Sequence, residues 1–192
     1  MITIKAEEAV KDRAGEATST ATGDFEFILH VNPDGGVSEN RNACLRKAKG
    51  DTIIFIDDDL YEYPKGWNET LTTVLKSHSV LMAGPRLLNR DNSIQATVSK
   101  SSNVTDSYIE VDYIPGACMA YRKNGLLFNE EYKGWGMEDI QFQLELKKLN
   151  PAGCIYLCNN VKMVHANEMK NEPKNGKRNK ELFRKKWGFV VE

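Results

Sequence analysis

Residues 50–60 read Gly-Asp-Thr-Ile-Ile-Phe-Ile-Asp-Asp-Asp-Leu, an unbroken apolar run that ends in three carboxylates. The run from Ile53 to Ile56 has no polar residue, which is typical of a central strand buried on both faces. Three adjacent aspartates repel one another, so a stable fold accommodates them best beside a cation. Because ligands of open α/β sheets bind at the carboxyl ends of strands, we expect a divalent cation and substrate phosphates at Asp57–Asp59. An ordinary acidic turn is the alternative interpretation.

The composition is that of an ordinary globular protein and indicates one domain. The chain has 192 residues, of which 28% are charged and 41% hydrophobic, and its formal net charge is −1. A charge so close to zero gives no general attraction to nucleic acid or to a membrane surface. The charge is uneven, however, because residues 168–192 hold eight Lys and Arg against four Glu.

The cysteines and the apolar runs indicate a reduced, cytoplasmic protein. No apolar run approaches the roughly 20 residues of a membrane span, and the first residues lack the pattern of a signal peptide. Cys44 and Cys118 lie in apolar contexts and are expected in the core. Cys154 and Cys158 would share one face of a strand, but a zinc site would need a second pair of ligands.

Strand and helix patterns alternate along the chain, which predicts an α/β layered fold. Strands are expected at 1–5, 25–31, 51–60, 80–83, 108–122 (interrupted by a turn), 154–158 and 161–164. Helices are expected at 6–16, 38–49 with Ser38 as N-cap, from Pro64 onward, at 138–149 and at 181–187. Residues 87–107 are polar and give no clear pattern.

Two more motifs carry side chains suited to chemistry. Residues 134–139 read Gly-Trp-Gly-Met-Glu-Asp, so that two acids open a predicted helix. Acids are favourable at a helix N-terminus, and this is their structural interpretation. His165 closes an apolar strand, and its structural interpretation is a hydrogen-bonded histidine at a strand end.

Together and in this order, the three motifs resemble the GT-A glycosyltransferases. Residues 32–59 are similar to the segment of glycosyltransferase family 2 that reads Asn-x-Gly-Val-Ser-x-x-Arg-Asn, a helix, Gly-Asp, a buried strand and Asp-x-Asp. Residues 115–139 resemble the acceptor half of that family and the carboxyl-terminal domain of the β-1,4-galactosyltransferases. Residues 163–165, followed by 170–173, extend the second likeness.

The resemblance implies a GT-A (Rossmann-like) mixed central sheet flanked by helices in a single compact domain. It divides the chain into a nucleotide-sugar and metal half at about 1–62, an acceptor and catalytic half at about 63–166, and a basic tail at about 167–192. One departure is the short first half, in which only the turn at Asn32–Gly35 stands where the family reads uracil.

The roles of the donor-side residues follow from the resemblance. Asp57 and Asp59 form the Asp-x-Asp pair, with Asp59 the more direct metal ligand and Asp58 beside the donor. His165 matches a metal ligand, and imidazole favours Mn²⁺ over Mg²⁺. Asp34 corresponds to the uracil turn. Arg41 matches an arginine that contacts the nucleotide base, the alternative being an exposed helix residue.

The acceptor side takes its roles from the Gly-Trp-Gly-Met-Glu-Asp motif. The resemblance makes Asp139 the general base and Glu138 a hydrogen-bond partner of the acceptor. Trp135, followed by Gly136, would be a mobile platform for the face of a sugar.

The implied function is an inverting, metal-dependent transfer of sugar from a nucleoside diphosphate sugar, UDP-linked by analogy, to an acceptor hydroxyl. The acceptor could be a saccharide, a protein, a lipid-linked sugar or a modified nucleic acid. One alternative is a haloacid-dehalogenase-like phosphohydrolase, although Tyr61 stands where that motif has Thr or Val. Another is a non-catalytic module that binds sugar or nucleic acid with the basic tail.

Overall fold

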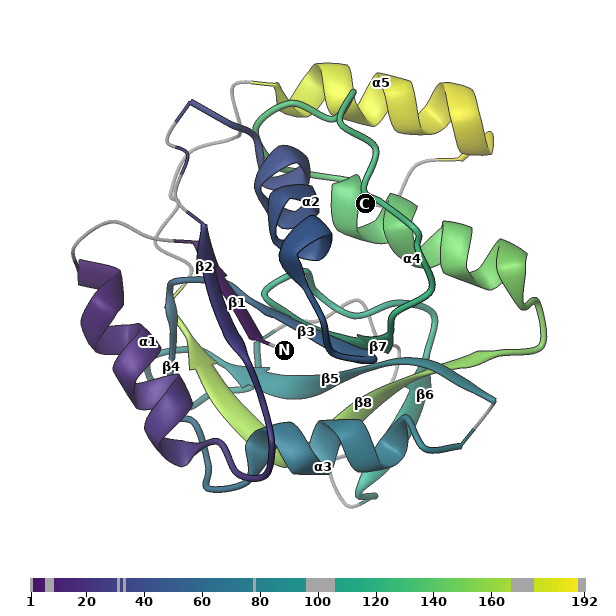
Figure 1. The fold of residues 1–192 in the computed structure, drawn as a ribbon. Coiled ribbons are helices and arrows are strands. Elements are labelled where there is room, and N and C mark those ends of the chain that lie inside the picture. Colours follow the sequence, from purple (N-terminus) through teal and green to yellow (C-terminus); the bar gives the residue numbers. More distant parts are fainter. Residues whose placement is uncertain are drawn as a thin grey trace.

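The fold is described from a computed structural model over residues 2–5, 9–30, 32, 34–77, 79–95, 106–166 and 175–189 (Figure 1). The strands are β1 (Ile2–Lys5), β2 (Phe27–His30), β3 (Thr52–Ile56), β4 (Leu60–Tyr61), β5 (Val80–Leu88), β6 (Tyr108–Val111), β7 (Cys118–Arg122) and β8 (Cys154–His165). The helices are α1 (Ala9–Thr20), α2 (Val37–Lys47), α3 (Trp67–Val74), α4 (Glu138–Leu149) and α5 (Gly176–Trp187).

Within the described residues, the strands form one mixed sheet in the order β2-β1-β3-β7-β5-β8-β4, with β6 also paired to β8. The pairings β1–β2, β1–β3 and β5–β8 are parallel, and β7 runs antiparallel to both β3 and β5. The carboxyl ends of β3, β5 and β8 therefore lie at the same edge of the sheet, together with the start of β7. Segments far apart in the sequence meet at this edge.

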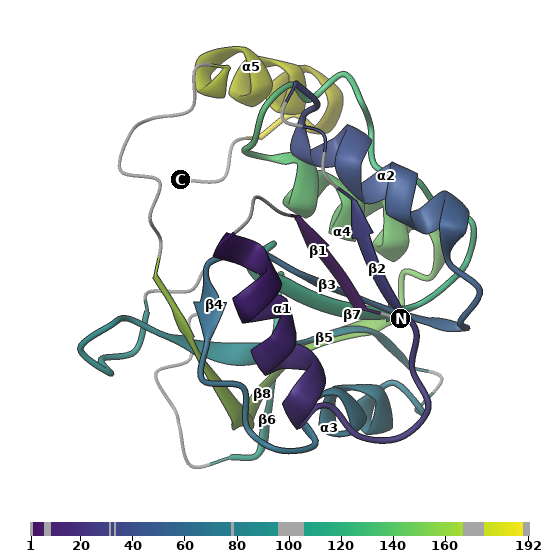
Figure 2. The ribbon, with the colours of Figure 1, turned by 60° about the vertical axis from the view of Figure 1, so that its left-hand side comes forward.

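Helices cover both faces of the sheet, α1 and α3 on one side and α2 and α4 on the other (Figures 1 and 2). Ile54 and Ile56 pack with the core on the α1–α3 side, whereas Ile53 and Phe55 pack with the core on the α2–α4 side. The alternation of strand side chains thus sends the apolar run of β3 into two separate cores. The expected central strand and the single compact α/β domain are confirmed.

Several element boundaries differ from those predicted; α1, for example, ends at Thr20 rather than at residue 16, and β3 ends at Ile56 rather than at residue 60. β5 continues to Leu88, and the two short strands expected at 154–158 and 161–164 are one strand, β8. These strands pair from Val80 with Cys154 to Leu88 with Val164, with register shifts at Val80–Met82 and at Pro85–Arg86, where the partner in β8 changes from Cys158 to Lys162. The buried Asn159 accepts a hydrogen bond from Arg86 Nε within this shift. Because of its pairing with neighbouring strands, β8 continues through the polar residues Asn159 and Asn160, where the sequence predicted a break between two strands. Helix α5 begins at Gly176, earlier than predicted.

The start of α2 corrects the assignment of its cap. Gly36, not Ser38, is the N-cap, and Ser38 lies buried inside the first turn. The Gly36 amide is bound by Glu39 Oε2 at 2.9 Å, and the Val37 amide by the Gly134 carbonyl at 2.8 Å. One backbone amide at the helix start therefore finds its hydrogen-bond acceptor in a loop distant in sequence, and the local sequence does not reveal this contact.

The four cysteines, all within the described residues, form no disulfide bond, and Cys44 and Cys118 are buried as expected. In the part of the chain that is described, no helix has the length and apolar character needed to cross a bilayer. The first part of the basic tail, residues 167–174, lies outside the described residues.

Candidate active site

The three aspartates form the turn between β3 and β4, at the carboxyl edge of the sheet. β3 ends at Ile56, and the Asp57 amide donates to the Ala117 carbonyl at 2.8 Å. This bond fixes the turn against the start of β7. The Asp57 side chain is 38% exposed, whereas that of Asp59 is 16% exposed. The turn thus leaves the Asp57 carboxylate partly exposed to solvent, whereas the Asp59 carboxylate lies against His165 of β8.

His165 lies opposite this turn, at the end of β8, where it pairs with Leu60 of β4. Its Nε2 atom is 3.2 Å from Asp59 Oδ1, and its Nδ1 atom is 3.0 Å from Gln95 Oε1. Burial lowers the pKa of His165, but the hydrogen bond and charge of Asp59, with the charge of Asp57, raise it more, and the net shift is upward. The structure therefore brings together Asp59 and His165, which the sequence paired as metal ligands.

Arg41 of α2 is the cation at the centre of the site. Its side chain is buried, and Nη2 lies 3.1 Å from Asp57 Oδ1 while Nη1 lies 3.5 Å from Glu138 Oε1. Nη2 also donates to the Gly116 carbonyl at 2.9 Å. The guanidinium lies over the rings of Phe128 and Phe55, at 5.3 and 5.7 Å from their centroids. The interpretation of Arg41 as an exposed helix residue is wrong, and its contact with a nucleotide base stays a prediction.

Glu138 and Asp139 open α4 from a strained turn, because Gly136 and the N-cap Met137 both have positive φ, 102° and 72°. Asp139 is held by two backbone amides, Gly116 to Oδ2 at 2.9 Å and Ile140 to Oδ1 at 2.8 Å. A side chain at residue 116 would meet both Asp139 and Arg41 within 3.2 Å, so this close approach requires glycine.

Glu138 is 5% exposed, and its Oε2 atom has no hydrogen-bond partner among the described residues. Burial first, and then the neighbouring Asp139, raise the pKa of Glu138 to about 7, although Arg41 opposes the rise. Burial likewise raises the pKa of Asp139, against the effects of Arg41 and the two amides. Because they are desolvated, the carboxylates of Glu138 and Asp139 accept a proton more readily than exposed carboxylates do.

The loop that carries Trp135 and Gly136 is tied at both of its flanks. The Gly134 carbonyl accepts from the Val37 amide, and Lys133 Nζ lies 2.5 Å from Glu39 Oε1 on α2. From α5, Asn179 Nδ2 donates to the Lys133 and Trp135 carbonyls at 2.9 and 3.2 Å, and Asn179 Oδ1 accepts from the Lys133 amide at 3.3 Å. Trp135 and Gly136 remain partly exposed.

Two donor-side residues are less tightly placed. Asp34 is exposed in the turn after β2, and within the described residues no hydrogen bond or ion pair joins it to Arg41 or Asp57. Asp58 is half-buried in the turn between β3 and β4. Over the described residues, no group of three or more His, Cys, Asp and Glu side chains is arranged to hold a metal ion. Asp59 and His165, which are predicted as metal ligands, lie together as a pair, and their role as metal ligands stays a prediction.

Three residues of the site were missed from the sequence. Gln95 contacts His165 but lies in the segment without a pattern, and Gly116 was seen only as part of a turn. Asn179 lies before the stretch predicted as the last helix. A Pro-Gly turn facing a predicted acidic helix start could have indicated Gly116, whereas nothing local points to the other two.

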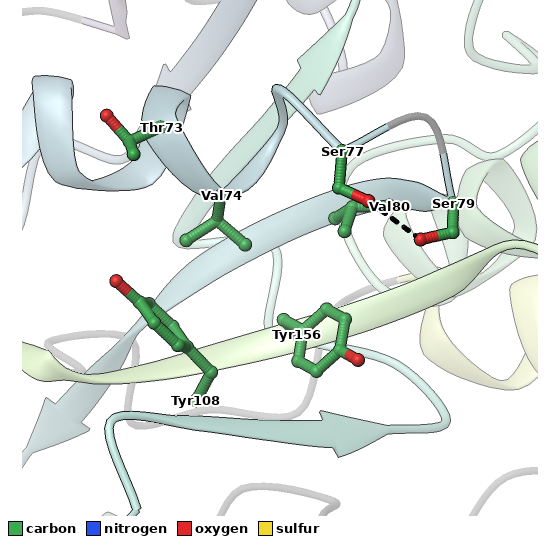
Figure 3. A pocket seen from close by; sticks show the side chains of 7 residues that line it. All are labelled: Thr73, Val74, Ser77, Ser79, Val80, Tyr108 and Tyr156. Atoms are coloured by element: carbon green, nitrogen blue, oxygen red, sulfur yellow. Dashed lines mark hydrogen bonds between the residues drawn. The ribbon is translucent and has the colours of Figure 1, made fainter.

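A separate pocket of about 350 Å³ lies on the α3 side of the sheet (Figure 3). It is lined by Thr73, Val74, Ser77, Ser79, Val80, Tyr108 and Tyr156. Val80 begins β5, whereas Asp57 follows the end of the parallel strand β3, so the pocket is remote from the carboxylates. It forms no part of the site described above.

This mixed sheet flanked by helices has the architecture of the GT-A class of glycosyltransferases. Comparison with solved structures agrees. GalNAc-T7, in a crystal structure with UDP, GalNAc and Mn²⁺, matches with a TM-score of 0.73 and 12% identity, over 97% of this chain and 47% of that one. This chain thus spans about half the length of that structure.

Two further structures have the same fold. TarS 1–349 of S. aureus in complex with UDP-GlcNAc matches with a TM-score of 0.69 and 13% identity, over 100% of this chain and 67% of that one. A197 from STIV matches with a TM-score of 0.56 and 13% identity, over 85% and 83%. At these identities the likeness establishes the GT-A fold, which was predicted from the sequence. No curated protein matches the chain.

Residues 8–129 match the model of the family described as Glycosyl transferase family 2, and the chain belongs to this family. The predicted resemblance to family 2 and the prediction of a glycosyltransferase are therefore confirmed. Membership also excludes the phosphohydrolase alternative. The matched residues end before Gly134, so the likeness of the later motifs to the β-1,4-galactosyltransferases stays a prediction.

Proposed function

We propose that this chain transfers a sugar from a UDP-sugar to an acceptor hydroxyl with inversion at the anomeric carbon, assisted by a divalent cation. The observation that carries the proposal is the set of contacts of Arg41. One buried guanidinium joins Asp57 of the donor-side turn to Glu138 at the start of α4. Donor and acceptor groups are thereby held in one charge network. A UDP-sugar donor is favoured by fold neighbours crystallised with UDP or UDP-GlcNAc.

Asp59 and His165 fit a divalent cation. With Gln95 Oε1 accepting from Nδ1–H, the Nε2 lone pair of His165 faces a carboxylate oxygen 3.2 Å away, an arrangement that needs a proton or a metal ion between them. One imidazole and carboxylate oxygens suit Mn²⁺, and Mg²⁺ is the alternative. When bound, the ion would neutralise the diphosphate that departs from the donor. Asp57, Asp58, Asp34 and Arg41 would line the nucleotide on the same side.

Asp139 is the proposed general base. Its two amide contacts fix the carboxylate while leaving each oxygen a lone pair for the acceptor hydroxyl. The acceptor oxygen forms a bond to the anomeric carbon as the bond from that carbon to the diphosphate breaks, and the hydroxyl proton passes to Asp139. Its raised pKa favours proton transfer. Glu138 would orient the acceptor, and Trp135 with Gly136 would support its ring.

Release of nucleotide tests the proposal. UDP-linked sugars would be incubated with the protein, Mn²⁺ and a panel of simple acceptors, and free UDP measured. We expect at least one donor to give UDP at a rate that rises with acceptor. Tight binding of UDP-sugars without release over the whole panel would favour the alternative of a non-catalytic sugar-binding module.

A further inference from the structure

Helix α5 turns one face to the protein and a basic face outward. Phe183 is fully buried and Asn179 is 1% exposed. Residues 176–187 contain six Lys and Arg and a single Glu, in a chain whose net charge is −1. The exposed charged side chains are Lys177, Arg178, Lys180, Glu181, Arg184, Lys185 and Lys186. Positive charge is thus concentrated in one helix of a nearly neutral protein.

Only part of this charge is used within the protein. Lys186 Nζ lies 2.6 Å from Glu145 Oε1, and Arg178 Nη1 donates to the Glu131 carbonyl at 2.6 Å. The other four, Lys177, Lys180, Arg184 and Lys185, form no ion pair with a carboxylate in the described part of the chain. Neighbouring cations without partners repel one another, and an external anion would relieve that repulsion.

The first turns of α5 are joined to the loop that carries Trp135. Asn179 binds the carbonyls of Lys133 and Trp135 and the amide of Lys133. The basic face therefore begins beside the loop assigned above to the acceptor. A helix of this length extends over about 18 Å, so its charges would meet several units of a chain rather than one small ion.

An anionic chain fits this face better than a lipid bilayer does. Amphipathic helices enter membranes through their apolar face. In α5 the apolar Phe183 faces the protein core, against Trp187 and Phe189, at ring distances of 6.3 and 5.5 Å. That side chain is not available for insertion.

We propose that the exposed face of α5, through Lys177, Lys180, Arg184 and Lys185, binds an acceptor chain that carries phosphate or carboxylate groups and leads it to the Lys133–Gly136 loop. The inference rests on the proposed function, because it takes that loop as the acceptor side. It adds the chemical class of the acceptor, a polyanion.

Two matched variants test it. In the first, Lys177, Lys180, Arg184 and Lys185 are all replaced by Gln. In the control, the exposed Lys47, Lys65, Lys76 and Lys162, which lie elsewhere, are replaced by Gln, so that the net charge changes equally. The probes are inorganic polyphosphate, polygalacturonate, neutral dextran and phosphatidylglycerol vesicles. The first two distinguish phosphate from carboxylate as the recognised group.

We expect at least one polyanion to bind the wild-type protein, with an affinity that falls roughly 50–150-fold between about 50 and 200 mM salt for four contacts. The α5 variant should bind at least tenfold more weakly, the control variant should bind normally, and dextran should not bind. Hydrogen exchange of the Val37 and Lys133 amides should slow when the polyanion binds, because both fasten the acceptor loop.

Three results would overturn the inference: no binding of either polyanion, equal losses in the two variants, or vesicle binding that is tighter than polymer binding and depends on the same four residues. UDP titration with Mn²⁺, run in parallel, distinguishes a failure of this inference from a failure of the proposed function. Normal UDP binding without polyanion binding overturns this inference alone, whereas the loss of both overturns the proposed function as well.

Discussion

At the scale of single residues, the site depends on one buried cation among three carboxylates. Arg41 contacts Asp57 and Glu138 directly, and its Nη2 atom shares Gly116 with Asp139. Burial lowers the pKa of Arg41, but the nearby carboxylates raise it more, so the guanidinium stays charged. Its removal would leave buried negative charge without compensation.

Arg41→Met should therefore lower the free energy of unfolding by about 3–5 kcal/mol, as is usual when one partner of a buried ion pair is removed. Urea titration measures the loss. The double variant Arg41→Met with Glu138→Gln should recover part of it, because the orphaned carboxylate is gone. A single variant within about 1 kcal/mol of wild type would contradict the assignment of Arg41 as the organising cation.

Glu138 should make stability depend on pH. Its pKa is raised to about 7 in the folded protein from an ordinary 4.5. Between these values the folded state holds a proton that the unfolded state has released, so the stability contribution of Glu138 falls as pH rises from about 4.5 to 7. Unfolding of wild type and Glu138→Gln across this range should give curves that converge at low pH and separate toward pH 7. Parallel curves would refute the raised pKa.

At the scale of elements, the acceptor loop is positioned by two helices that are distant in sequence. α2 binds it through the Val37 amide, and α5 through Asn179. Helix 138–149 was predicted at its exact bounds, since apolar rows and an acidic start define it locally. The extents of β5, β8 and α5 could not be predicted in the same way, because strand pairing and loop contacts determine them.

Asn179→Asp should loosen this loop. The aspartate can still accept from the Lys133 amide, but it loses both donated bonds and sets a negative charge beside two carbonyl oxygens. We expect a loss of about 1–3 kcal/mol and faster hydrogen exchange at Val37 and Lys133. The exposed Asn160→Asp is the control and should change neither. Unaltered exchange in the first variant would show that the loop does not depend on α5.

At the scale of the whole molecule, the sheet topology assembles the site. Because β3, β5 and β8 run parallel, the Asp57–Asp59 turn and His165 reach the same edge although more than a hundred residues separate them. The sequence motifs predicted this fold, and the expected pair Asp59 and His165 does lie together, whereas Asp34 is exposed and its place in the site stays a prediction. The motifs did not predict Gln95, Gly116 or Asn179, because these are recruited through contacts that only the packed chain provides.

The proposed metal dependence belongs to this scale, because Asp59 in the turn after β3 and His165 at the end of β8 come from distant parts of the chain. UDP should bind at least about tenfold more tightly with Mn²⁺ than with EDTA, because the Asp57–Asp59 turn and a diphosphate repel each other. His165→Ala should weaken the Mn²⁺ titration while the protein stays folded. Gln95→Leu should weaken it by about tenfold, through loss of the group that orients the imidazole. Calorimetry measures all three effects. Equal UDP affinity with and without metal would contradict the proposal that a divalent cation assists donor binding.

The most direct measurement is the rate at which Asp139→Asn releases UDP from a donor that wild type uses, at saturating donor, acceptor and Mn²⁺. Asparagine keeps the size of the side chain and an acceptor for the Gly116 or Ile140 amide, but it cannot take up the hydroxyl proton. We expect a rate roughly 10²–10⁴-fold below wild type, with UDP and Mn²⁺ affinity unchanged. A near-native rate would contradict inversion with Asp139 as the general base.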